Sequence, residues 1–433
     1  MPVVAGFTLV SPAMFPSLRL CLLLSCAVAV AARADQPKPI GALVAEIAAD
    51  HPELRLLEAE LAAARAEGRG VVSGPTELSV EFGRKRVRAT GGELAAEGTV
   101  WSVSLSRTFD WQGRTALRKA IARRDVELAE AGLARLRREL ESRALGLAFG
   151  LHAAHTKATA AREVADRHAE LVATFLAREP AGLAPELEIR ALEARALVLQ
   201  RRATAAELGV AAALVELNQL RGLPPETPLI LAGASPVHGD APAGTALIDA
   251  ARANNFEFRA RCLELERQDD VVRLARRERL PELTVSPFVE REGGDGTETT
   301  VGIGLSLPLP GGRAPAAGVA VAEARRAQAE AALRAAGLEL EREVLLAARA
   351  YAAHRAEMGR WAPDTVARLR VAAAEADRHY RLGAVPLGTY LELQEAYLEA
   401  VEALLDTETE ALASGLRLQL LTGLDFGAAR LSP

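Results

Sequence analysis

Apolar residues alternate with polar ones in the strand-forming parts of two segments of the chain, 76–107 and 282–307. Period-two alternation predicts strands with one apolar and one polar face, and turn-forming residues such as Gly293 and Gly294 join them into hairpins. Each segment is therefore expected to form one β-hairpin. The apolar positions are Leu78, Val80, Phe82, Trp101, Val103, Leu105, Leu283, Val285, Val301, Ile303 and Leu305.

The remaining segments carry apolar residues at helical spacing. They predict opening helices at 40–70 and 247–277, long helices at 114–178 and 315–382, and returning helices at 185–221 and 386–422. A helix of some 65 residues spans about 100 Å, which no compact domain contains. Pro363 lies inside the second long helix and is expected to kink it, because proline removes a backbone hydrogen bond.

The order of elements occurs twice, which indicates a gene duplication rather than a solenoid of small units. We assign 35–222 to the first repeat, 223–245 to a linker, 246–423 to the second repeat and 424–433 to a tail, with tight turns at 179–185 and 383–386. The recurring landmarks, about 200 residues apart, are Glu53-Leu54-Arg55 with Glu257-Phe258-Arg259, Glu77-Leu78 with Glu282-Leu283, Leu105-Ser106 with Leu305-Ser306, Gly113-Arg114 with Gly312-Arg313, and Gly222 with Gly423.

The amino terminus reads as an export signal over residues 1–34. Arg19 precedes an apolar run, and Ala32-Arg33-Ala34 offers a cleavage site before Asp35. An alternative takes Leu23-Leu24-Ser25-Cys26 as a lipoprotein signal, with Cys26 lipidated. Both alternatives place the mature chain in the cell envelope, and cleavage after Ala34 leaves Cys262 as its one cysteine, so no intrachain disulfide is expected.

Composition narrows the class of protein. Aromatic residues make up only 4%, as in proteins built of long helices, and a net charge of −5 with mixed signs gives no basic stripe for nucleic acid. No later stretch of about 18 residues is apolar enough to predict a transmembrane helix.

The hairpins suggest how the chain meets a membrane. Four strands of about ten residues have the length to cross an outer membrane, but they cannot close a barrel. Three chains together supply twelve strands, which can close into a barrel without unpaired edges. The same threefold symmetry would bring the long helices together into a helical tube. The expected fold class is mainly α with a small β part: a long α-helical barrel plus a trimer-shared 12-stranded β-barrel, with an internal two-fold repeat.

Five short motifs, in order, resemble those of the TolC-like outer-membrane factors, nearest to the branch that serves cobalt-zinc-cadmium cation pumps. They are Asp50-His51-Pro52-Glu53-Leu54, Pro75-Thr76-Glu77-Leu78-Ser79, Gly113-Arg114, Tyr380-Arg381-Leu382-Gly383 and Leu420-Leu421-Thr422-Gly423. The resemblance implies a homotrimer in the outer membrane with a long periplasmic extension. It also implies partners: a periplasmic adaptor and an inner-membrane pump.

The same resemblance implies functional positions at the periplasmic tip. Docking of the adaptor is expected at Gly182, Leu183, Ala184, Pro185, Gly383, Ala384, Val385 and Pro386. Tyr380 matches the tip tyrosine, while Glu188 and Glu392 match acidic residues of the gate and lumen. Thr389 and Val385 stand where the family can carry a second acid and an arginine, so a salt-bridge lock is in doubt. A competing interpretation makes Glu188 and Glu392 solvated helix-face charges.

We expect no cofactor, metal site or catalytic site. His152 and His155 share a helical face, but no third ligand lies near them in the sequence. The function predicted is a passive exit duct for cations or small toxic compounds. The alternative is a periplasmic coiled-coil adaptor or structural protein whose hairpins form a soluble β-domain. The two alternatives require different strands. A membrane barrel needs one apolar face toward lipid, whereas a soluble domain needs a core packed between two layers.

Overall fold

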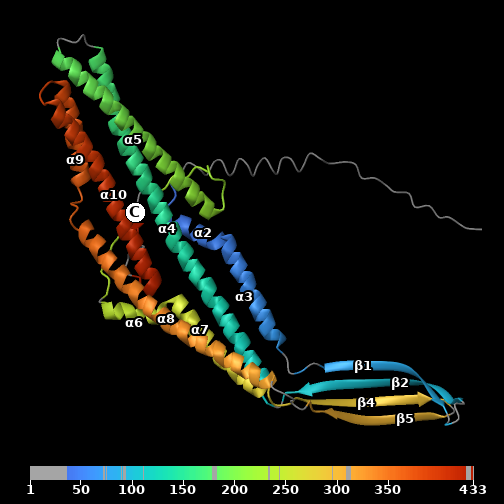
Figure 1. Ribbon diagram of the computed structural model, residues 1–433. Coiled ribbons are helices and arrows are strands. Elements are labelled where there is room, and N and C mark those ends of the chain that lie inside the picture. The colour runs from blue at the N-terminus through green and yellow to red at the C-terminus, as the bar shows by residue number, and fades with distance from the viewer. Residues whose placement is uncertain are drawn as a thin grey trace, which may run out of the picture.

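The computed structural model describes residues 37–71, 74, 76–88, 90, 94–110, 112–177, 183–232, 235–242, 244–294, 296–308, 314–425 and 431–432. The expected signal peptide and Cys26 lie outside these residues. Figure 1 shows an elongated molecule with a four-stranded sheet at one end and long helices that run away from it. The prediction of a mainly α fold with a small β part is confirmed.

The elements follow one another in the same order in both repeats. The first repeat comprises α2 (Ile40–Asp50), α3 (Pro52–Gly70), β1 (Thr76–Arg88), β2 (Leu94–Phe109), α4 (Arg114–Leu176) and α5 (Leu183–Arg221). The second comprises α6 (Gly244–Asn254), α7 (Phe256–Arg277), β4 (Leu283–Gly293), β5 (Thr297–Ser306), α8 (Ala314–Met358), α9 (Thr365–Arg381) and α10 (Leu387–Thr422). Two short strands, β3 (Ser235–Pro236) and β6 (Leu431–Ser432), pair with each other.

Each opening helix is divided in two, whereas the sequence analysis expected one continuous helix. The divisions fall at His51 and Asn255, which both have extended backbone angles. His51 Nδ1 accepts the backbone N–H of Glu53, and Asn255 Oδ1 accepts that of Phe258. A side chain that caps the next helix favours a new start over continuation, so these two residues set the break.

The second long helix is also divided, where only a kink was expected. It ends at Met358 and restarts at Thr365. Pro363 lacks an N–H and disfavours helical angles in the residue before it. Gly359 also weakens the helix, because glycine loses more conformational entropy than other residues when it becomes helical. The first long helix, α4, has no such pair and continues for 63 residues, about 95 Å.

A core of small and branched apolar residues joins the helices along their length. Ala144, Ala148 and Phe149 of α4 are fully buried in a cluster that includes Leu398 and Leu412 of α10. Small residues allow helix axes to approach closely, while Phe149 and the leucines fill the space between them. The core therefore ties the first repeat to the second.

A buried arginine fastens the helices to the sheet. Arg114, the first residue of α4, donates to the carbonyl oxygens of Arg277 and Leu280 and forms an ion pair with Glu282 at 2.5 Å. Asp110 accepts the N–H groups of Arg114 and Thr115, and although burial opposes ionisation, these bonds lower the pKa of its carboxyl to about 2. The junction thus links α4 to the segment between α7 and β4.

Replacement of Gly423 by alanine should destabilise the fold. Gly423 ends α10 with a φ of 67°, and a Cβ there would lie 2.6 Å from the Cβ of Asn254. The expected loss is about 1–2 kcal/mol or more, seen as a lower midpoint of thermal unfolding. Gly388→Ala is the matched control, since Gly388 is in the same helix with nothing within 4 Å. An unchanged midpoint in Gly423→Ala would contradict this account of the helix end.

Candidate functional site

The four-stranded sheet has the order β1-β2-β4-β5, with every neighbouring pair antiparallel (Figure 1). Leu78 pairs with Leu105, Val103 with Val289, and Val285 with Leu305. Directly opposed residues lie on one face of a sheet, so this register places all the predicted apolar positions on the same face. We call it the apolar face.

The apolar face is open in the single chain. Phe82 is 82% exposed and Val301 75%, and Leu78, Ile303 and Leu305 are similarly exposed. The register adds Pro287 and Val289 to this face, and the period-two pattern did not predict either residue there. An exposed apolar surface of this extent marks an interaction site rather than a folded core.

The opposite face is polar and predominantly acidic. Its carboxylates come from three strands: Glu77, Glu81, Glu290, Glu292 and Glu298. Lys85 is on the same face and forms an ion pair with Glu292 across β2. We call this the acidic face.

One aromatic ring interrupts the acidic face. Phe288 lies opposite Gly302, and a Cβ on Gly302 would come within 2.6 Å of the Phe288 ring. The glycine at position 302 therefore makes room for the ring.

The far end of the helices carries the predicted tip residues. Residues 178–182, including Gly182, lie outside the described residues; Leu183, Ala184 and Pro185 form the first turn of α5. Gly383 has a φ of 73° and, with Ala384, closes α9 through hydrogen bonds to the carbonyl oxygens of Tyr380 and His379. Pro386 stands at the N-cap of α10 rather than at its first helical position.

The predicted gate residues differ in their surroundings. Tyr380 is 7% exposed and stacks between the rings of Phe175 and Tyr390, at 5.6 and 5.3 Å between centroids. Burial raises the pKa of its hydroxyl, and the charge of Glu188 adds to the effect. Glu188 and Glu392 are exposed, and no ion pair joins either to another described residue.

A buried histidine that the sequence analysis overlooked extends this stack. His168 is fully buried; its Nε2 lies 3.0 Å from the carbonyl oxygen of Leu192 and its Nδ1 3.0 Å from the Tyr390 hydroxyl. A carbonyl only accepts, so Nε2 carries the proton and Nδ1 accepts from Tyr390. Burial lowers the pKa of His168, which keeps it neutral. The bonds join α4, α5 and α10 near the tip.

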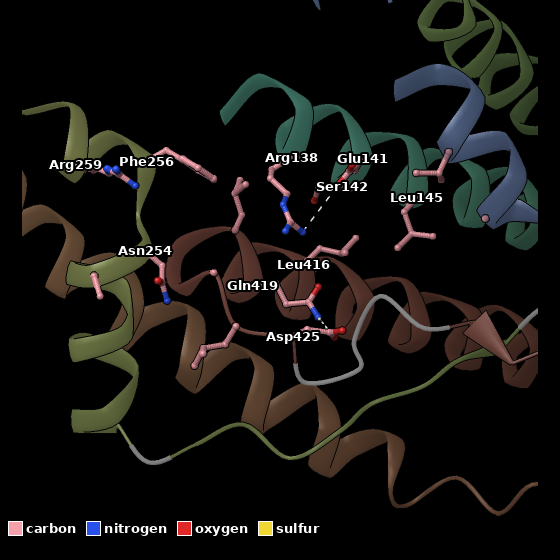
Figure 2. Close-up of a pocket in the computed structure, with 16 residues that line it drawn as sticks. Arg138, Glu141, Ser142, Leu145, Asn254, Phe256, Arg259, Leu416, Gln419 and Asp425 are labelled. Atoms are coloured by element: carbon pink, nitrogen blue, oxygen red, sulfur yellow. Dashed lines mark hydrogen bonds and ion pairs between the residues drawn. The ribbon is translucent and has the colours of Figure 1, made fainter. Parts of the chain in front are cut away.

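Residues of both repeats line a cavity of about 730 Å³ (Figure 2). Arg138 and Glu141 of α4 face each other there at 4.0 Å, and Gln419 of α10 donates to Asp425 at 3.2 Å. Among the described residues no three His, Cys, Asp or Glu side chains gather as metal ligands. No described helix has the length and apolar content that a membrane crossing needs.

Tyr390→Phe should destabilise the tip region, because the buried Nδ1 of His168 would lose its hydrogen bond. The expected cost is about 1–3 kcal/mol, measured by thermal or denaturant unfolding. Tyr380→Phe provides the control: its hydroxyl is buried without a hydrogen-bond partner among the described residues, so its removal should be neutral or stabilising. Equal effects of the two changes would rule out the assigned bonds.

Known proteins share this architecture. Residues 247–424 match the family described as "Outer membrane efflux protein", whereas no curated protein matches the sequence. The solved structure of the Campylobacter jejuni CmeC outer membrane channel aligns with a TM-score of 0.74 at 17% identity, covering 90% of this chain and 86% of that one.

Two further structures agree with this alignment. A crystal structure of CusC, which folds to form a transmembrane channel, aligns with a TM-score of 0.71 at 15% identity, covering 89% of this chain and 92% of that one. The Neisseria gonorrhoeae MtrE outer membrane channel in its open state aligns with 0.69 at 17% identity, covering 90% of each chain. The second repeat therefore matches the outer membrane efflux protein family, and the fold that these channels share extends over both repeats.

Proposed function

We propose that the chain is one third of a passive outer-membrane exit duct. The observation that carries the proposal is the division of the sheet into an exposed apolar face and an acidic face. A sheet of this kind suits a barrel wall, with lipid against one side and water against the other. The role requires no catalysis, because the inner-membrane pump supplies the energy.

Closure of the barrel is proposed to use three copies. In the single chain β1 and β5 are the edge strands of the sheet, and unpaired backbone groups are costly in lipid. Three chains supply twelve strands and leave no edge. Exposed apolar residues on α5 and α8, among them Leu197, Leu208 and Leu338, suit contacts between helices of neighbouring copies.

The sheet argues against the alternative of a periplasmic adaptor with a soluble β-domain. Such a domain would cover its apolar strand face with a second layer. Among the described residues no second layer lies over Phe82, Val301 or Ile303, which remain mostly exposed. A lipid contact accounts for this surface better.

The helix end remote from the sheet is proposed to be the periplasmic tip. The turns at Gly182 and Gly383 would dock a periplasmic adaptor, and Tyr380, Glu188 and Glu392 would form the gate and luminal acids. The exposure of Glu188 and Glu392 leaves them accessible for this role. Burial of Tyr380 within the chain suggests that it braces the tip rather than lining the lumen alone.

Cations or small toxic compounds are the proposed cargo, delivered by an inner-membrane pump. Three copies would line the barrel with fifteen glutamates against three lysines, since each acidic face carries five and one. A negatively charged lumen attracts cations and repels anions. The likeness to cobalt-zinc-cadmium systems is consistent with this cargo.

The full mature chain should extract in detergent as a trimer and should conduct ions in a planar bilayer. The double variant Glu81→Gln/Glu290→Gln should keep the trimer and lose part of the cation selectivity, because it removes two of five carboxylates per chain. Ser79→Ala, on the same face, is the neutral control. A water-soluble monomer or dimer that never inserts would refute the duct and favour the adaptor.

A further inference from the structure

The end of the apolar face farthest from the helices carries a cluster of arginines. Arg84 and Arg86 follow Phe82 at two-residue steps along β1, and Arg291 pairs with Trp101 across β2 and β4. Paired residues share a face, so all three arginines lie on the apolar face. Arg84 and Arg86 lie just past its aromatic residues, and Arg291 is level with Trp101. We call them the arginine rim.

The arginine rim is exposed, and the carboxylates beside it do not balance its positive charge. The side chains of Arg84 and Arg86 are 66% and 57% exposed, and both contact one carboxylate, Glu97, with Arg86 Nε at 3.3 Å. Arg291 is exposed and forms no ion pair with another described residue. Three positive charges against one negative leave a net charge of about +2 per chain.

At this end of the strands the two faces of the sheet carry charges of opposite sign. The acidic face carries Glu290, Glu292 and Glu298 beside Lys85, whereas the rim is basic. A hairpin tip that merely needed solubility would have no reason to sort its charges by face. The sorting points to an anionic partner on the outer side alone.

The distance along the strand fits the thickness of a membrane. Phe109 and Trp101 bound the apolar stretch of β2, and the segment from one to the other has nine residues. A tilted strand needs about 9–11 residues to cross a membrane, so the stretch has the required length. At the helix end Arg107 lies over the Phe109 ring at 5.4 Å, while the rim begins level with Trp101 and extends past it at the other boundary.

We propose that the arginine rim binds phosphate groups of lipids in the leaflet farthest from the helices, the outer leaflet. The inference rests on the proposed function, since it requires the apolar face to meet lipid. Guanidinium groups bind phosphate through charge-assisted, often bidentate hydrogen bonds. The apolar face would contact the acyl chains of the same lipids, so headgroup and tail are recognised on one continuous surface.

The test measures binding of a bisphosphorylated glycolipid, lipid A, to the detergent-purified full chain by native mass spectrometry. The wild type should retain lipid A in preference to its dephosphorylated form. The triple variant Arg84→Gln/Arg86→Gln/Arg291→Gln should bind it about tenfold to 100-fold more weakly, as expected for three basic groups at a membrane surface. Lys85→Gln, in the same strand but on the acidic face, should bind like the wild type.

A second variant acts in the opposite direction. Glu97→Gln removes the carboxylate that contacts two rim arginines, so binding should strengthen severalfold. Unchanged affinity in the triple variant, equal binding of dephosphorylated lipid, or displacement by millimolar inorganic phosphate would overturn the proposal. Insertion into phosphatidylcholine vesicles separates the two claims: a wild type that inserts without any phosphate preference contradicts the rim alone, whereas failure to insert contradicts the duct.

Discussion

The structure depends on one constraint: four strands carry an apolar face that nothing else in the described chain covers. A sheet of four strands has two edges with unpaired backbone groups. Exposure of apolar side chains such as Phe82 and Val301 to water is unfavourable relative to their burial. Lipid satisfies the face and neighbouring copies satisfy the edges. The proposed membrane location and the proposed trimer therefore follow from the same physical requirement.

The helical part positions the sheet and separates it from the tip. Arg114 fixes α4 to the segment before β4, so both hairpins leave the helices at one junction. About 80 Å away along α4, His168 and Tyr390 hold three helices together near the other end. Rigid connections at both ends of α4 suit a long duct whose tip must stay in register.

Local patterns predicted much of the fold, because they depend on neighbours in sequence. Period-two alternation identified the apolar strand positions, and the register shows that they share a face. The pattern did not predict Pro287 and Val289 on this face, because proline is uncommon within strands. The helix breaks at His51 and Asn255 were missed since a capping side chain competes with continuation only through its own hydrogen bond.

The aromatic stack and the arginine rim depend on contacts between distant segments. His168 and Tyr390 are 222 positions apart, so no sequence period links them. Arg84 and Arg291 come together only through the pairing of β2 with both β1 and β4. Charge at these positions looks unremarkable along the chain, and its sorting by face emerges only from the register.

Site-by-site labelling of β1 tests the two-faced sheet most directly. Single cysteines at positions 77–82, in a Cys262→Ser background and in protein reconstituted into bilayers, would be exposed to a water-soluble thiol reagent and to a lipid-phase quencher. A barrel wall predicts strict alternation: cysteines at positions 77, 79 and 81 react from water, and cysteines at positions 78, 80 and 82 respond to the lipid quencher. Uniform labelling from water at all six positions would contradict a barrel wall.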